Sequence, residues 1–174
     1  DVDNFKLLNN VITYVGTTGT KMNNAVRVTG ELKKSTNVTV EGNTFDITIP
    51  SAAVGYDEMY NSISYTDGMS FYACDGLTIK NNDVSLNYNG VVGSWDTIHV
   101  LTVGGSNFDF DEDYETIYPY VCSNVIISDN KINANGHSYI YGIYGAMDKF
   151  EIKNNNLNIT SDVHYVDAIG IDGP

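Results

Sequence analysis

Basic residues are scarce in this chain of 174 residues, which has 9 Lys and Arg against 22 Asp and Glu. Arg27 is the only arginine, and the formal net charge at pH 7 is −13. Nucleic acids and anionic membrane surfaces attract proteins with basic patches. The composition therefore argues against both as partners.

Long apolar runs, proline and cysteine are also scarce. No stretch is apolar for long enough to cross a bilayer, so no direct membrane insertion is expected of this segment. The 3 prolines and 16 glycines are too few for a low-complexity chain, and 42% hydrophobic residues are enough for a core. The length fits one domain or part of one.

The chain does contain a short sequence motif, here called the phrase, that recurs around an asparagine. Each copy carries apolar residues five and three positions before the asparagine and two and four positions after it, with mostly polar residues between. This alternation predicts two short strands that meet at each asparagine. The anchor asparagines are Asn10, Asn43, Asn82, Asn130 and Asn155.

The residue before each anchor favours a sharp bend. These residues are Asn9, Gly42, Asn81, Asp129 and Asn154. Such types tolerate the left-handed backbone region, and one such residue bends a chain without reversing it. We therefore expect a coil whose strands pair in parallel, with anchors stacked about 4.8 Å apart in a hydrogen-bonded ladder. The alternative is that asparagine is simply a common turn residue, but the fixed apolar offsets favour the coil.

Successive anchors are 33, 39, 48 and 25 residues apart. The shortest interval estimates a bare coil, and we expect the excess in the others to project as loops. Each interval also needs a third strand. The candidates are Ala25–Val28, Met69–Tyr72, Thr97–Val103, Tyr139–Tyr144 and Ala168–Ile171.

The two cysteines, Cys74 and Cys122, both lie eight residues before their anchors. They are expected side by side on neighbouring coils, at a Cα separation that a disulfide allows. The alternative is two small buried thiols in a column with Val2, Ser35 and Met147. Stacked side chains that point the same way fit a disulfide poorly, which favours the thiols.

The phrase from Asn37 to Phe45, echoed from Ser123 to Asn130, resembles the parallel β-helix repeat of the pectate-lyase-like superfamily. Within it, the acidic, Asn- and Tyr-rich composition is most similar to adhesin-like surface proteins of methanogenic archaea. The resemblance implies secretion, anchoring elsewhere in the chain, and binding to another cell or its glycans. Fold likeness is a weak guide to function.

The expected fold is all-β: a right-handed, single-stranded parallel β-helix of about five coils, with an Asn ladder at one turn and long loop insertions. Residues 1–174 are expected to form a single β-helix segment, a fragment of a longer surface protein, because the chain begins in mid-pattern and neither end has a polar cap. Open ends make end-to-end self-association an expectation.

Our primary hypothesis for function is a non-enzymatic, extracellular cell-surface module: a rigid β-helix that binds a glycan or a protein of another cell through its inserted acidic and aromatic loops. The alternative is a polysaccharide lyase or glycoside hydrolase, and a third possibility is a structural spacer. For the enzyme, Gly136-His137-Ser138 is only a partial match to the Gly-His-Gly of polygalacturonase-like members, and Arg-Ile-Lys is absent. We expect Arg27 to point outward and the lone His99 and His164 to be structural. No catalytic residue is assigned.

Two groups of residues depart from the repeat. Tyrosine and tryptophan side chains suit sugar or protein partners, although they could instead cover the outer sheets; the nominated binding residues are Trp95, Tyr114, Tyr118, Tyr120, Tyr141 and Tyr144. Clustered carboxylates suit Ca²⁺, although they could form a solvated acidic loop; the candidate ligands are Asp109, Asp111, Asp113 and Glu115. No other cofactor is expected. Calorimetry with calcium and with magnesium tests the metal site, and no heat with either would end that hypothesis.

Overall fold

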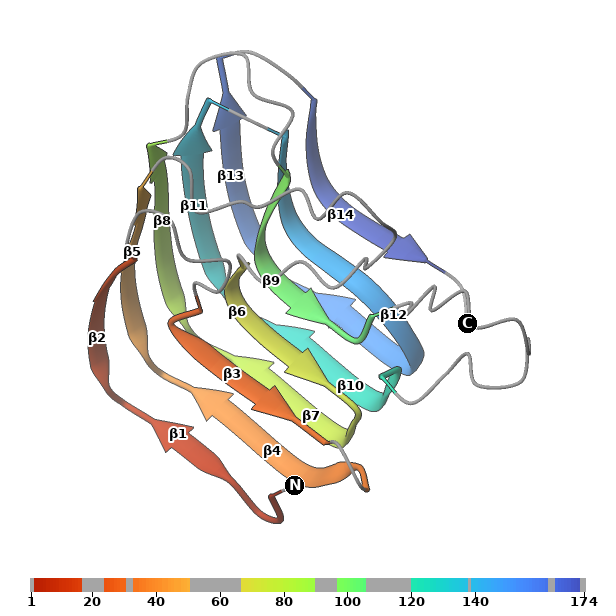
Figure 1. Cartoon of the computed structure of the whole chain (residues 1–174). Coiled ribbons are helices and arrows are strands. Elements are labelled where there is room, and N and C mark those ends of the chain that lie inside the picture. Colours follow the sequence, from red (N-terminus) through yellow and green to blue (C-terminus); the bar gives the residue numbers. More distant parts are fainter. Residues whose placement is uncertain are drawn as a thin grey trace.

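The computed structural model describes residues 2–16, 24–30, 33–50, 67–89, 97–105, 120–137, 139–162 and 165–172. Within these ranges the chain is all-β, and the strands gather into curled sheets (Figure 1). None of the described segments is a helix that could cross a bilayer.

The described strands pair in three groups, which we call faces 1, 2 and 3. Face 1 contains β1 (Lys6–Leu8), β4 (Ser35–Glu41), β7 (Cys74–Lys80), β10 (Cys122–Ser128) and the second half of β12 (Tyr139–Lys153). Face 2 contains β2 (Val11–Val15), β5 (Thr44–Pro50), β8 (Asp83–Asn89), β11 (Lys131–Gly136) and β13 (Asn156–Ser161). Face 3 contains β3 (Val26–Thr29), β6 (Asp67–Tyr72), β9 (Thr97–Val103), the first half of β12, and β14 (Val166–Asp172).

Every pairing among these strands is parallel, and each strand pairs with its counterpart three strands along the chain. The long strand β12 counts twice, because its first half pairs with β9 and β14 and its second half with β10. It thereby joins faces 1 and 3 into one nine-stranded sheet, while face 2 is a separate sheet of five strands. The all-β class and the parallel pairing predicted from the sequence are confirmed.

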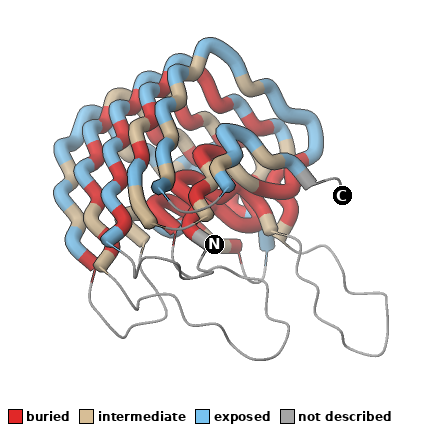
Figure 2. The backbone as a smooth tube through the Cα atoms, turned by 90° about the horizontal axis from the view of Figure 1, so that it is seen from above, coloured by how far each residue is buried: buried red, intermediate tan, exposed pale blue. Residues whose placement is uncertain are grey.

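The core lies between the faces and follows the apolar offsets of the repeat. Buried and exposed residues alternate along the strands of face 2 (Figure 2), so that Phe45 and Ile47 of β5 are buried while Asp46 between them is not. Apolar residues of the first and last strands are only partly buried, because each of those strands has a neighbour on one side alone. They include Phe5, Leu7, Ile12, Tyr14, Ile152, Leu157 and Ile159.

The predicted bend before each anchor is confirmed. All five residues have a left-handed backbone, with φ of 56° at Asn9, 68° at Gly42, 55° at Asn81, 57° at Asp129 and 54° at Asn154. Asparagine, aspartate and glycine reach this region at little cost. The chain can therefore turn between faces 1 and 2 at a single residue.

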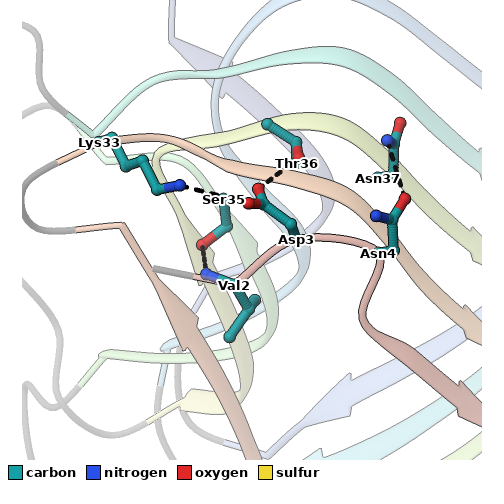
Figure 3. Close-up of polar contacts among 7 residues, drawn as sticks. All are labelled: Val2, Asp3, Asn4, Lys33, Ser35, Thr36 and Asn37. Carbon is teal, nitrogen blue, oxygen red and sulfur yellow. Dashed lines mark hydrogen bonds and ion pairs between the residues drawn. The ribbon is translucent and has the colours of Figure 1, made fainter.

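A second left-handed column, which the sequence reasoning missed, lies six residues before the anchors. Its φ values are 57° at Asn4, 52° at Asn37, 76° at Gly76, 54° at Asn124 and 54° at Lys149. Asn37 Nδ2 donates to Asn4 Oδ1 at 3.2 Å, as Figure 3 shows beside the neighbouring contacts of Asp3. Asn and Gly recur at this offset, and this recurrence could have predicted the left-handed backbone. Nothing in the sequence predicts a left-handed backbone at Lys149.

The anchor asparagines are joined by hydrogen bonds in one direction along the stack. The backbone N–H and the Nδ2 of Asn43 both donate to Asn82 Oδ1 at 3.0 Å, and Nδ2 also donates to Leu7 O at 2.9 Å. Asn10, Asn82 and Asn130 donate in the same way to the next anchor. The ladder thus supplies partners for N–H groups that the turn removes from the sheet.

Cys74 and Cys122 are free, buried thiols in neighbouring strands. In the strand register, Ser35 pairs with Cys74 and Cys122 pairs with Met147. These pairs agree with the column of small buried side chains that the sequence predicted. Cys122 Sγ lies 3.4 Å from the backbone N–H of Cys74 and 3.3 Å from Phe71 O, to which it donates. The contact between the two thiols, together with burial, raises the pKa of Cys74. The thiol therefore stays protonated at neutral pH, which makes it a poor nucleophile.

On the outer side of face 1, Asp75 supports a prediction about acid stability. Its Oδ1 accepts from Asn124 Nδ2 at 2.6 Å and from Ser123 Oγ at 3.2 Å, and these bonds lower its pKa below 3.8. Because the folded-state pKa is depressed, the stabilisation is present above pH 3.8 and is lost as the pH falls through the lowered value.

Asp75→Asn should therefore reduce the acid dependence of the unfolding free energy. The effect should stay below about 1 kcal/mol, because Asp75 is only partly buried and solvent screens its carboxylate. Urea titrations of wild type and variant at neutral and acidic pH measure it, and identical pH profiles would contradict it.

Candidate functional site

A buried cluster of polar and aromatic side chains lies on the outer side of face 3, across β6, β9 and β12. A Cβ atom at Gly68 would meet the core side chains of Leu86 and Ile47. The neighbouring Asp67 therefore points away from the core, and its register partner His99 points the same way. We call Asp67, Tyr72, His99, Tyr141 and Tyr144 the face-3 cluster.

Asp67 is the polar centre of this cluster. Its Oδ1 lies 3.1 Å from His99 Nδ1, and its Oδ2 accepts from the hydroxyl of Tyr72 at 3.2 Å. The Asp67 side chain is fully buried and that of His99 is 9% exposed. A buried carboxylate needs such donors, because an unpaired buried charge is costly.

The electrostatics of the cluster keep Tyr72 protonated. Burial and the adjacent Asp67 carboxylate both raise the pKa of this phenol. At neutral pH Tyr72 is therefore a hydrogen-bond donor rather than a phenolate. His99 meets the Asp67 carboxylate through Nδ1. Its second ring nitrogen, Nε2, lies outside this contact.

Three aromatic rings pack together beside the carboxylate. His99 stacks on Tyr144 with ring centroids 4.4 Å apart and planes 10° apart. Tyr141 meets the edges of both, at 5.2 Å from His99 and 5.3 Å from Tyr144. Both tyrosines are partly exposed, so the aromatic group reaches the protein surface.

At the β3 side of the cluster, Arg27 brings a positive charge close to Tyr72. Its guanidinium carbon lies 5.8 Å from the centroid of the Tyr72 ring, and its Nε donates to Thr29 Oγ1 at 3.2 Å. Tyr120 meets Tyr72 edge to face at 6.3 Å. Arg27 is exposed between the less exposed Val26 and Val28, which confirms the predicted outward direction.

Two hydroxyl groups of face 3 have no hydrogen-bond partner within the described part of the chain. They belong to Ser70 and Thr102, and both oxygens are buried. The register places the two residues opposite each other, between Arg27 on β3 and Tyr144 on β12. An unpaired buried hydroxyl costs roughly 1–3 kcal/mol. Such groups are uncommon in folded proteins, which sets this pair of hydroxyls apart from the other buried polar groups of face 3.

The structure brings some of the nominated binding residues together and leaves others undetermined. Tyr141 and Tyr144 belong to the face-3 cluster, and Tyr120 contacts Tyr72. The remaining nominated residues lie outside the described residues: Trp95, Tyr114, Tyr118, Asp109, Asp111, Asp113 and Glu115, together with His164. Calcium binding at the acidic run stays a prediction. Within the described ranges, no three His, Cys, Asp or Glu side chains are grouped so as to hold a metal ion.

Sequence reasoning missed Asp67, Tyr72, Ser70 and Thr102 as site residues, and it expected His99 to be structural. The predicted third strand began at Met69, but β6 begins at Asp67, and this difference hid the pairing of Asp67 with His99. His137, in the partial Gly-His-Gly match, lies elsewhere, at the end of β11. Its Nδ1 contacts the Asp162 carboxylate at 2.7 Å in an exposed pair.

No protein-family model matches the chain, and comparisons with curated proteins and with solved structures also find no match. Its function is therefore inferred from the side chains and their geometry.

Proposed function

We propose that this chain is a non-enzymatic module of a right-handed parallel β-helix that binds a glycan at the face-3 cluster. Pairing between strands three apart along the chain supports the β-helix, because five successive sets of three strands make up the described faces. On this proposal the module is of the pectate-lyase-like, adhesin-like kind and works at the cell surface. Its acidic composition and its 13 tyrosines are compatible with that location.

The observation that carries glycan binding is the aromatic group next to unpaired hydroxyls. The rings of Tyr144 and Tyr141 offer apolar faces to the C–H face of a sugar. In the same row of side chains, Ser70 and Thr102 offer buried donors and acceptors for sugar hydroxyls. Ligand sites commonly combine apolar walls with a few well-placed polar groups. A protein partner of another cell could also use the tyrosines, but it would not need this row of hydroxyls.

A second candidate, a polysaccharide-cleaving enzyme, is favoured by one specific observation. Asp67 and His99 come from adjacent strands and meet on one sheet face, as a carboxylate and a base would in an active site. A carboxylate at Nδ1 orients an imidazole so that Nε2 can transfer a proton. Against the enzyme, the imidazole is stacked on Tyr144 and almost entirely buried, so we rank it second.

A glycan array combined with a reducing-end release assay separates the two candidates. We expect saturable binding to one class of glycan without release of reducing ends or of unsaturated uronate. Tyr144→Ala should weaken binding by about tenfold or more, since stacked aromatic contacts contribute roughly 1–3 kcal/mol in ligand sites. The matched control is Tyr165→Ala, because Tyr165 is 76% exposed and stacks only on Tyr139 among the ring contacts described. Release of sugar ends by wild type, abolished in Asp67→Asn, would instead establish the enzyme.

A further inference from the structure

A column of three sulfur-containing side chains lies in the core, where the chain passes from face 3 to face 1. Cys122 of β10 pairs with Met147 of β12. On its other side, the pairing of Ser123 with Asp75 places Cys122 next to Cys74 of β7. Cys74 and Cys122 are fully buried, Met147 is 2% exposed, and all three belong to the same core cluster. The three side chains therefore follow one another on neighbouring strands.

The spacing of this column suits a metal ion between the two thiols better than a bond between them. Side chains that stack on neighbouring parallel strands stand about 4.8 Å apart. A disulfide requires its sulfur atoms to approach to about 2.05 Å. Two metal–thiolate bonds of about 2.3 Å, arranged in a line, span about 4.6 Å. The strand spacing alone thus favours the sulfur separation of a two-coordinate metal site.

The ligand types indicate the class of ion. Thiolate and thioether sulfur atoms are soft donors, and they select soft ions such as Cu(I). Zn²⁺ in a structural site takes four ligands, and the described ranges hold no group of three His, Cys, Asp or Glu side chains around these thiols. Hard ions such as Ca²⁺ and Mg²⁺ need several oxygen ligands. A soft monovalent cation, which accepts two or three sulfur ligands, fits the column.

Loss of the thiol protons would leave no carbonyl group of this region without a donor. Cys74 Sγ donates to Tyr72 O at 3.6 Å. Cys122 Sγ donates to Phe71 O at 3.3 Å. Each of these oxygens also accepts from a backbone N–H, at 3.1 Å and 2.7 Å respectively. Both carbonyls therefore keep a partner when the thiols ionise, and the usual penalty for an unpaired buried acceptor does not arise.

Two groups favour negative charge on the sulfur atoms. The backbone N–H of Cys74 donates to Cys122 Sγ at 3.4 Å. Lys34 Nζ donates at 3.2 Å to the hydroxyl of Ser123, the residue after Cys122, and its positive charge favours the thiolate form of both cysteines. A monovalent cation between two thiolates leaves a single negative charge in the core. These groups offset part of the cost of burying it.

From these observations we propose that Cys74, Cys122 and Met147 form a binding site for one soft monovalent metal ion of the Cu(I) class. Each cysteine releases its thiol proton to solvent, and a lone pair on each thiolate sulfur forms a coordinate bond to the ion. Met147 adds its thioether sulfur, and the oxidation state of the metal does not change. The inference is independent of the proposed glycan site, because the face-3 cluster lies on the outer side of the sheet and this column lies in the core.

Binding of the ion should stabilise the fold. The three ligands come from β7, β10 and β12, which are successive strands of face 1. One shared ion therefore links three neighbouring strands that are otherwise joined by backbone hydrogen bonds and packing. An ion that binds the folded chain much more tightly than the unfolded chain stabilises it by mass action.

Anaerobic titration of the reduced chain with Ag(I) tests the proposal, because Ag(I) shares the preference for sulfur and does not change oxidation state here. Native mass spectrometry should show one ion per chain, and Cu(I) should displace it. Since two protons leave, the apparent affinity should rise about a hundredfold for each pH unit while both thiols are protonated. The thermal midpoint should rise by about 5 °C or more. Absence of binding, or an affinity independent of pH, would overturn the proposal.

Single substitutions locate the ion. Cys74→Ser and Cys122→Ser should each weaken binding by about a hundredfold or more, because each removes a thiolate ligand. Serine is accepted in this column, since Ser35 already occupies it on β4. Met147→Leu conserves side-chain volume and should weaken binding by about tenfold. Met69→Leu is the matched control, because Met69 is a fully buried methionine of β6 outside the column, and its affinity should equal that of wild type.

Circular dichroism of each variant without metal establishes that it is folded. If a serine variant fails to fold, the comparison of Met147→Leu with Met69→Leu decides the question, since equal affinities would contradict the site. Undiminished binding of Ag(I) by the folded double serine variant would place the ion elsewhere and contradict it too. A chain isolated in air whose mass rises by two hydrogens on reduction would also contradict the proposal, because its sulfur atoms would then be close enough to bond to each other.

Discussion

Asn82→Asp should lower the free energy of unfolding by about 3–5 kcal/mol at neutral pH, the usual cost of an uncompensated buried charge. Asn82 is 2% exposed and sits in the middle of the ladder. Its Nδ2 donates to Val40 O at 2.9 Å and to Asn130 Oδ1 at 3.0 Å. A carboxylate keeps the shape but turns both donations into contacts between acceptors. Because folded domains are stable by only about 5–15 kcal/mol, the variant should be close to unfolded in mild urea.

The pH dependence of this deficit identifies its cause. Burial among carbonyl oxygens should raise the folded-state pKa of the new carboxyl above the ordinary value near 3.9. The folded state then binds the proton more tightly than the unfolded state. The deficit relative to wild type should therefore be smallest below about pH 4 and should grow as the pH rises through the raised pKa. Urea titrations of both proteins at several pH values measure the difference, and a deficit independent of pH would contradict the explanation.

Asn10→Asp is the matched control at the exposed end of the ladder. Asn10 has the same place in the repeat, but its side chain is exposed and, within the described ranges, donates to Leu8 O and to Asn43 Oδ1. Water can solvate the new carboxylate there. We expect a loss of about 1 kcal/mol, the ordinary net value of a hydrogen bond. Equal losses at Asn10 and Asn82 would mean that burial of the ladder has no part in its stabilisation.

Gly104→Ala should destabilise the protein by roughly 3 kcal/mol, through backbone strain and a steric clash. Gly104 has φ of 72°, in the left-handed region, and its N–H donates to Phe71 O at 2.7 Å. A Cβ atom there would collide with the carbonyl oxygen of Ala146. Since Ala146 lies on β12 two residues after Tyr144, the collision would also disturb the aromatic part of the face-3 cluster. Thermal and urea unfolding measure the loss.

Gly76→Asn separates strain from collision. Gly76 also has a left-handed backbone, with φ of 76°, but the nearest atom to a Cβ there would be the Asn37 side-chain oxygen, at 3.3 Å. Asparagine already occupies this column at Asn37 and Asn124. We expect a change in unfolding free energy within about 0.5 kcal/mol, as for surface substitutions without a special role. A loss as large as that of Gly104→Ala would show that the left-handed backbone alone sets the cost.

The repeated phrase predicted the parts of the fold that depend on local chemistry. Apolar residues at fixed offsets predicted the strands, and the turn residues from Asn9 to Asn154 predicted the left-handed bends. Parallel pairing followed because a chain that bends the same way at each anchor brings like strands together. Lys149 could not be predicted in the same way, since its left-handed backbone is imposed by its place in the column rather than by its own preference.

The candidate site was only partly predictable, because its residues come from strands far apart in the sequence. Asp67 and His99 are 32 residues apart and meet only through the register of β6 with β9. That register depends on the residue at which each third strand begins. The intervals between anchors vary in length, so they do not predict that residue. Tyr141 and Tyr144 were found because they cluster in the sequence itself. Ser70 and Thr102 carry no sequence signal, since their importance lies in being buried without a partner.

Glycan binding at the face-3 cluster is tested most directly by NMR of the aromatic rings. The ring signals of Tyr141, Tyr144 and His99 would be followed while the glycan with the strongest array signal is added. Binding at the cluster predicts saturable shifts of all three, with Tyr165 unchanged as the internal control. Failure of every glycan to bind, or saturable binding that leaves Tyr141, Tyr144 and His99 unshifted, would contradict it.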